Sequence, residues 1–69
     1  MMVSFKNTDI PVWKIRLGTV VSWELFSVHY GHIVSMSIRD GYTHMITVAI
    51  TKDKNVTLKA QEITWLEPH

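Results

Sequence analysis

Histidine is the residue type in this 69-residue chain best suited to metal binding or proton transfer, and His29, His32 and His44 lie close enough in sequence to be tested together. Zinc takes three or four protein ligands, each at ~2 Å. The strand register predicted below places His32 and His44 four residues apart along a ladder, which is about 13 Å at ~3.3 Å per residue. His29 and His32 alone provide too few ligands, and the chain has no cysteine. We therefore predict no metal site and no cofactor.

The other reactive side chains have no catalytic arrangement. Asp40 and Asp53 fall in predicted turns, each beside a cation, as turn carboxylates commonly do. Ser22, Ser35 and Ser37 alternate along predicted strands without the flanking glycines of a nucleophile elbow. The three glycines are isolated, so no glycine-rich phosphate loop is present. We predict that the protein is not an enzyme.

A ring-rich segment, residues 23–32, is the strongest candidate for binding. Aromatic side chains dominate the energetics of protein interfaces, and loops on a rigid scaffold commonly carry recognition. We predict a loop here that engages a protein partner, which makes the protein a non-catalytic binding module or a small regulator. The alternative is that Trp23 and Phe26 only close one end of a small core. The predicted partner-binding residues are Trp23, Phe26, His29, Tyr30 and His32.

Two other kinds of binding are alternatives. Lys14, Arg16 and Lys59 are predicted on outward strand faces, where cations beside rings could bind nucleic acid. A formal net charge of +1 gives little long-range attraction to phosphate. Alternatively, the chain is an obligate homo-oligomer with a ligand site at its interface. Its contact surface would then come from apolar residues predicted to point away from the core, which are Val20, Ile33, Met45 and Leu66.

Composition and periodicity define the elements that would position these residues. Val, Ile and Thr number 22 against 6 for Ala and Leu, which favours strands. Alternating apolar and polar residues predict five strands, with a bend at Gly18 in the first and a short 3-10 turn at Gln61-Glu62 before the last. The predicted strands are residues 12–25, 34–38, 42–51, 56–60 and 63–66. An open sheet of this size exposes its edges, so we predict closure into a small barrel or sandwich.

The register of the central hairpin follows from its turn. A three-residue turn, Arg39–Gly41, would set Met36 opposite His44 and Val34 opposite Ile46, whereas a two-residue turn would set apolar against polar side chains. Gly41 would provide the left-handed residue of that turn. The predicted core is Trp13, Ile15, Val21, Trp23, Val34, Met36, Ile38, Ile46, Val48, Ile50, Val56, Leu58, Ile63 and Trp65.

Over residues 12–66 the order of these elements resembles an SH3-like barrel of the KOW or plasmid-encoded type II dihydrofolate reductase kind. The resemblance rests on Gly18-Thr19-Val20-Val21, Tyr30-Gly31-His32-Ile33-Val34, Val48, Val56 and the turn at Ala60-Gln61-Glu62-Ile63. Such barrels mostly bind nucleic acids, peptides or copies of themselves. The reductases carry a Gln-Ile-Tyr segment where this chain has Thr57-Leu58-Lys59, so the resemblance implies the fold and not the reductase activity.

Length and composition also predict the setting. We expect one domain over residues 1–69, with residues 1–11 as an N-terminal arm outside the barrel. No run approaches the ~18 apolar residues of a membrane span, and the first residues lack the apolar core of a secretory signal. A cysteine-free chain fits a reducing compartment, so the predicted location is the cytoplasm.

Overall fold

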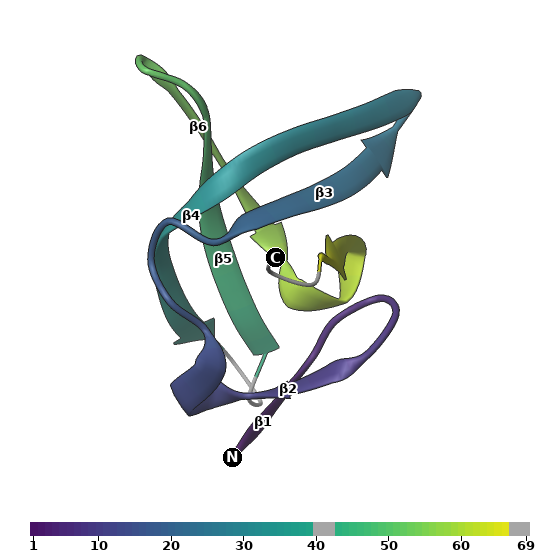
Figure 1. The fold of residues 1–69 in the computed structure, drawn as a ribbon, viewed down its shortest axis with the longest axis vertical. Helices are drawn as coiled ribbons and strands as arrows, with labels where there is room; N and C mark the ends of the chain where they lie inside the picture. The colour runs from purple at the N-terminus through teal and green to yellow at the C-terminus, as the bar shows by residue number, and fades with distance from the viewer. Residues whose placement is uncertain (40–42, 67–69) are drawn as a thin grey trace.

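The computed structural model describes residues 1–39 and 43–66, and the described chain is all-β (Figure 1). Strands β1 and β2 form a separate hairpin, and the other five strands form one antiparallel sheet in the order β6-β5-β4-β3-β7. The elements in chain order are β1 (Met2–Ser4), β2 (Asp9–Pro11), the 3-10 helix η1 (Val12–Lys14), β3 (Val20–Leu25), β4 (Ser27–Arg39), β5 (Thr43–Thr51), β6 (Lys54–Lys59), the 3-10 helix η3 (Ala60–Glu62) and β7 (Ile63–Trp65).

The five-stranded sheet is a meander whose last strand returns to its beginning. Strands β3 to β6 follow one another, and β7 then pairs antiparallel with β3, after the 3-10 turn η3. This confirms the predicted all-β class, the five-stranded sheet and the 3-10 turn before the last strand. Among the described residues, β6 and β7 do not pair with each other, so the sheet remains open.

Strand β4 connects two halves of the sheet. Its first half, up to His32, pairs with β3, and its second half, from His32 onward, pairs with β5. The register shifts between Ile33 and Ser35, where one extra residue forms a bulge that bends a strand. As a result, the β3–β4 hairpin and the β5–β6 hairpin extend in different directions from the core (Figure 1).

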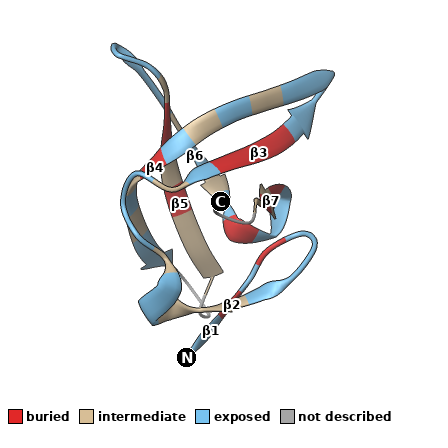
Figure 2. Cartoon of the chain, in the orientation of Figure 1, coloured by how far each residue is buried: buried red, intermediate tan, exposed pale blue. Residues whose placement is uncertain are grey.

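The core combines the sheet with the N-terminal hairpin (Figure 2). Phe5 is buried and its ring lies 5.1 Å from that of Trp65. Residues 1–11, which we expected as an arm, thus provide part of the core. The buried hydrophobic residues are Val3, Phe5, Val21, Trp23, Ile33, Ile46, Val48, Ala49, Ala60, Ile63 and Trp65.

Asn7 attaches the N-terminal hairpin to the free edge of β7. Its side-chain Nδ2 donates to the carbonyl of Trp65 (3.1 Å), and its Oδ1 accepts from the backbone N–H of Trp65 (2.9 Å). The backbone N–H of Lys6 donates to the carbonyl of Ile63 at 2.9 Å. Asn7 thus presents to β7 the donor and acceptor of one peptide group, as a neighbouring strand would.

The first part of the predicted strand 12–25 is wrong. Pro11, with φ of −58°, precedes the 3-10 turn η1, and Ile15 N–H closes it on the Val12 carbonyl at 3.2 Å. Side chains in such a turn spread around its axis, so alternation along the sequence does not define one buried face. Trp13, predicted in the core, is 72% exposed, whereas Ile15 packs partly against the core.

The predicted register of the β4–β5 hairpin is also wrong, by two residues. Met36 pairs with Ile46 and Ile38 pairs with His44. A shift of two residues keeps every side chain on its face, so the hydrophobic pattern could not distinguish the two registers. The predicted turn residues Asp40 and Gly41 lie outside the described residues.

Eleven of the fourteen predicted core residues are buried or pack against the core. Six predicted residues are buried and five others pack partly against them, whereas Ile38 is 51% exposed. Ile33, predicted to point outward, is 1% exposed, because the bulge after it reverses which alternate residues of β4 face the core. The six buried residues are Val21, Trp23, Ile46, Val48, Ile63 and Trp65, and the five partly buried ones are Ile15, Met36, Ile50, Val56 and Leu58.

Candidate functional site

The ring-rich segment 23–32 is a β-hairpin, so the prediction of a loop there is wrong. Trp23 pairs with His29 and Leu25 with Ser27, so the chain reverses at a single residue, Phe26. Phe26 has φ of 65°, a conformation that non-glycine residues seldom adopt. The sequence did not reveal this hairpin because the reversal at Phe26 interrupts the alternation of apolar and polar residues.

The inner face of the hairpin is anchored by Trp23. This indole is buried and stacks on the ring of its cross-strand partner His29, with centroids 5.8 Å apart and an interplanar angle of 22°. The Nε2 atom of His29 also lies 3.1 Å from the carbonyl oxygen of Leu25, close to the turn. These contacts hold the base and the tip of the hairpin in one arrangement.

Gly31 lets the hairpin approach the rest of the sheet. A Cβ atom at this position would contact Val48 Cγ1 far inside van der Waals distance and lie 2.7 Å from the carbonyl oxygen of Ala49. It would also lie 3.3 Å from the Trp23 ring. Gly31 is therefore the point at which β4 passes between the Trp23 ring and β5.

The tip of the hairpin and most of its outer face are apolar and exposed, and among residues 20–32 the one charged side chain exposed on the outer face is Glu24, opposite Val28. At the tip, Leu25 is 61% exposed and Phe26 is fully exposed. On the outer face, Val28 and Tyr30 of β4 and Val20 of β3 each have more than half of their surface exposed, and His32 is exposed next to Val20. Figure 2 shows this end of the β3–β4 hairpin mostly in the colour of exposed residues. We call Val20, Leu25, Phe26, Val28, Tyr30 and His32 the hairpin surface.

The structure divides the predicted partner-binding residues between two faces. Phe26, Tyr30 and His32 belong to the hairpin surface, whereas Trp23 is buried and His29 is half-buried against it. The sequence prediction missed Val20, Leu25 and Val28 as members of this surface. Pairing of Val20 with His32 and of Glu24 with Val28 would have revealed two of them, had the hairpin been recognised.

The predicted nucleic-acid-binding residues do not share a strand face. Lys14 is in η1, with its Nζ atom 5.4 Å from the centre of the exposed Trp13 ring. Arg16 is exposed in the connection between η1 and β3. Lys59 ends β6 and lines the cavity described below. Lys14 and Arg16 thus form one exposed segment with Trp13, and Lys59 belongs to another element.

The histidines are dispersed by the observed register. His32 pairs with Ala49, and His44 pairs with Ile38. His32 and Ile38 are six residues apart on β4, about 20 Å at ~3.3 Å per residue. No group of three or more His, Cys, Asp or Glu residues that could hold a metal ion occurs in residues 1–39 and 43–66.

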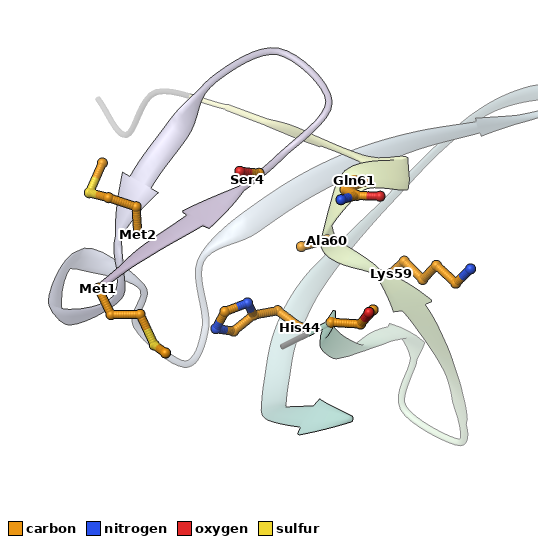
Figure 3. Close-up of a pocket in the computed structure, with 8 residues that line it drawn as sticks. Met1, Met2, Ser4, His44, Lys59, Ala60 and Gln61 are labelled. Atoms are coloured by element: carbon orange, nitrogen blue, oxygen red, sulfur yellow. The ribbon is translucent and has the colours of Figure 1, made fainter. Parts of the chain in front are cut away.

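A cavity of about 300 Å³ lies between the N-terminal hairpin, the start of β5 and the end of β6 (Figure 3). The Nε2 atom of His44 is buried there without a hydrogen-bond partner among the described residues. Sequence reasoning missed this cavity because its walls come from segments that are far apart in the chain. The lining residues are Met1, Met2, Ser4, Thr43, His44, Lys59, Ala60 and Gln61.

Comparison with known proteins identifies no relative of this chain, since no family model, no curated protein and no solved structure matches it. Its sheet and exposed hairpin are therefore the basis for assigning a function. No helix in the described part of the chain is long and apolar enough to cross a membrane.

Proposed function

We propose that this protein is a small SH3-like binding module that engages a protein partner through the hairpin surface. The observation that carries the proposal is the full exposure of Phe26 at the tip of a hairpin whose outer face also exposes Val20, Val28 and Tyr30. Rings in this position are the side chains that form interface hot spots. A contiguous apolar surface on a small protein is typical of an interaction site.

The conformation of Phe26 also supports binding. A large ring at a reversal with φ of 65° is unfavourable both in backbone conformation and in hydration. Glycine or asparagine would form the same reversal more easily and would leave no ring in water. A partner with an apolar pocket would bury the ring and account for a phenylalanine at this position.

The sheet order is the support for the SH3-like class. A meander whose last strand follows a 3-10 turn and pairs beside the first strand is the arrangement expected from the resemblance in sequence. We propose that the protein works in the cytoplasm, for which the absence of cysteine is the support. We also propose that it acts without a chemical step, as a binding module or a small regulator.

Capture and quantitative rebinding test the proposal. Tagged wild-type protein and the double variant Phe26→Ser/Tyr30→Ser are used as baits, and any captured protein is purified and titrated against both. The matched control is Trp13→Ser/Leu17→Ser, which removes two apolar side chains that are 72% and 71% exposed outside the hairpin. We expect at least ~10-fold weaker binding for the hairpin variant, since hot-spot truncations cost ~2 kcal/mol or more. Equal binding by all three proteins would refute the assignment.

Nucleic-acid binding is a second candidate, favoured by the contact between Lys14 and the exposed Trp13 ring. An exposed ring beside cations is the arrangement on which single-stranded bases stack. Arg16 adds a second exposed cation to this segment. The proposed binding element is therefore the segment that follows the N-terminal hairpin, away from the hairpin surface.

Anisotropy of a labelled single-stranded RNA and a labelled single-stranded DNA tests this candidate at ~50 and ~200 mM salt, since phosphate contacts weaken as salt rises. We expect binding at low salt that the Trp13→Ala variant loses. The control, Lys52→Ala/Lys54→Ala, removes two cations from another turn and should change affinity less. If wild-type protein does not bind at low salt, this candidate is excluded.

A further inference from the structure

We propose that the outer end of β4, residues 27–30, pairs edge to edge with the same segment of a second copy of this chain. This inference rests on the proposed binding role of the hairpin and names one partner for it. Residues 27–30 pair with β3 on one side, and the pairing with β5 begins only at His32. Their other side therefore has no neighbouring strand within the described chain. Unpaired strand edges present backbone N–H and C=O groups that readily pair with another chain.

Two other edges of the sheet are protected, which distinguishes them from this one. The outer edge of β7 is occupied by Asn7 and Lys6 through the three hydrogen bonds described above. The outer strand β6 begins at Lys54 and ends at Lys59, and lysine is the residue that proteins most often use to block pairing at an edge. Both edges thus carry a feature that opposes addition of a strand.

The outer end of β4 has no such feature. Residues 25–33 contain no Asp, Glu, Lys, Arg or Pro. Ser27, Val28 and Tyr30 are exposed, so the backbone between them is accessible to another strand. Two copies of this segment would meet without like charges facing each other, and charges are what usually prevents self-pairing.

Symmetry and packing select one register. In an antiparallel pair related by a two-fold axis perpendicular to the sheet, one residue must lie opposite its own copy across the axis, because only then do paired side chains share a face. The carbonyl of Ala49 already lies against Gly31, so Gly31 cannot take part. A pair centred on Val28 satisfies both conditions and uses the whole free edge, whereas a pair centred on Ser27 would leave Tyr30 unpaired. It sets Val28 opposite Val28 and Ser27 opposite His29, and it brings Phe26 of one copy beside Tyr30 of the other.

This pairing would extend the apolar outer face across both copies. Val28 and Tyr30 of each copy would lie on one continuous face, where cross-strand aromatic and β-branched neighbours stabilise a sheet. The exposed Phe26 ring would gain an aromatic neighbour. A two-stranded hairpin is only marginally stable in water, whereas a ribbon of three or more strands with an apolar face can be stable. Pairing of two hairpins into a four-stranded ribbon would therefore stabilise both.

Sedimentation velocity over a range of concentrations tests the proposal with two matched serine variants. Ser27 and Ser35 are both exposed residues of β4, but only Ser27 lies on the unpaired edge. We expect wild-type protein and Ser35→Lys to dimerise and Ser27→Lys to dimerise at least ~10-fold more weakly, since a lysine on a strand edge opposes the addition of another strand. Melting temperatures of the variants show whether each one is folded. A wild-type chain that stays monomeric throughout, or a Ser27→Lys variant that associates as the wild type does, would overturn the proposal.

Disulfide trapping tests the register, and the absence of native cysteine makes it specific. Val28→Cys should form a covalent dimer under mild oxidation, because the two residues on the axis lie opposite each other. Asn55→Cys, at an exposed position of β6, should not. The reverse pattern would refute edge pairing at β4. A monomeric chain that still loses a captured protein through Phe26→Ser/Tyr30→Ser would exclude self-pairing and leave the proposed function standing.

Discussion

Gly31 provides the sharpest test of how the hairpin is held on the sheet, through the substitution Gly31→Ala. The added methyl group would meet Val48 Cγ1, the carbonyl oxygen of Ala49 at 2.7 Å and the Trp23 ring at 3.3 Å. Val48 is fully buried and the Ala49 oxygen belongs to the backbone, so neither can easily move away. The strand must therefore shift away from β5, or the core must expand.

The magnitude follows from two opposing contributions. Overpacking of a core by a methyl group typically costs ~1–3 kcal/mol. Replacing a strand glycine by alanine returns ~0.5–1 kcal/mol through the lower entropy of the unfolded chain. Because the added methyl group meets a buried side chain and a backbone oxygen, the cost lies in the upper half of its range, and the net loss is about 1–2.5 kcal/mol of unfolding free energy. For a domain of this size, that lowers the Tm by roughly 4–20 °C.

Calorimetry and urea unfolding of the wild type, Gly31→Ala and Ser37→Ala measure this loss. Ser37 is an exposed residue of the same strand, so its variant should unfold within ~0.5 kcal/mol of the wild type. The double variant Gly31→Ala/Val48→Ala should be less destabilised than the sum of the two single variants, because removal of Cγ1 relieves one clash. A Gly31→Ala protein as stable as the wild type would refute the close approach of β4 to β5.

Two further stability predictions concern parts of the fold that local sequence pattern did not reveal. Asn7→Ala removes both hydrogen bonds to Trp65 and should lower the unfolding free energy, measured in urea titrations, by about 1–2 kcal/mol. An unchanged urea midpoint would show that water replaces the two hydrogen bonds at no cost. Ile33→Ala should cost ~2–5 kcal/mol and Val20→Ala about 0.5 kcal/mol or less, because Ile33 is 1% exposed and Val20 is 51% exposed. Equal losses of unfolding free energy at these two positions would contradict the burial of Ile33 before the β4 bulge.

Sequence pattern predicted the parts of this fold that depend on neighbouring residues. Alternation along Val21, Trp23 and Leu25 identified the inner face of β3, of which Val21 and Trp23 are buried. The break in alternation at Gln61-Glu62 identified the 3-10 turn η3 before the last strand. In each case the signal lies within a few residues, where side-chain period and backbone conformation are directly linked.

Features that depend on distant segments were not predictable in the same way. The alternation Val3-Ser4-Phe5 is visible in the sequence, but only contact with Trp65 makes Phe5 part of the core. The bulge next to Val34 is a matter of pairing with β5, and it turned Ile33 into the core, against the prediction. A shift of one residue in pairing thus decides which side chain of β4 faces the core.

The candidate site was predicted in composition but not in shape. The concentration of rings in residues 23–32 correctly indicated where exposed aromatic side chains would occur, since Phe26 and Tyr30 are exposed. It could not show that Trp23 and His29 lie on the opposite face. That requires recognising the hairpin, and no glycine marks the single-residue reversal at Phe26. Cross-strand pairing, rather than position in a loop, decides which rings are available.

The division of rings between two faces gives the hairpin separate structural and binding roles. Trp23, His29 and Gly31 fix its inner face to the sheet, so the outer face can be changed without loosening the fold. At concentrations where the chain is monomeric, substitutions at Phe26 and Tyr30 should therefore alter binding at nearly constant Tm, whereas Gly31→Ala should lower the Tm and weaken binding together. If Phe26→Ser/Tyr30→Ser lowered the Tm as much as Gly31→Ala does, the exposed rings would be stabilising the monomer. The exposure of the Phe26 and Tyr30 rings would then no longer support the inference that they bind a partner.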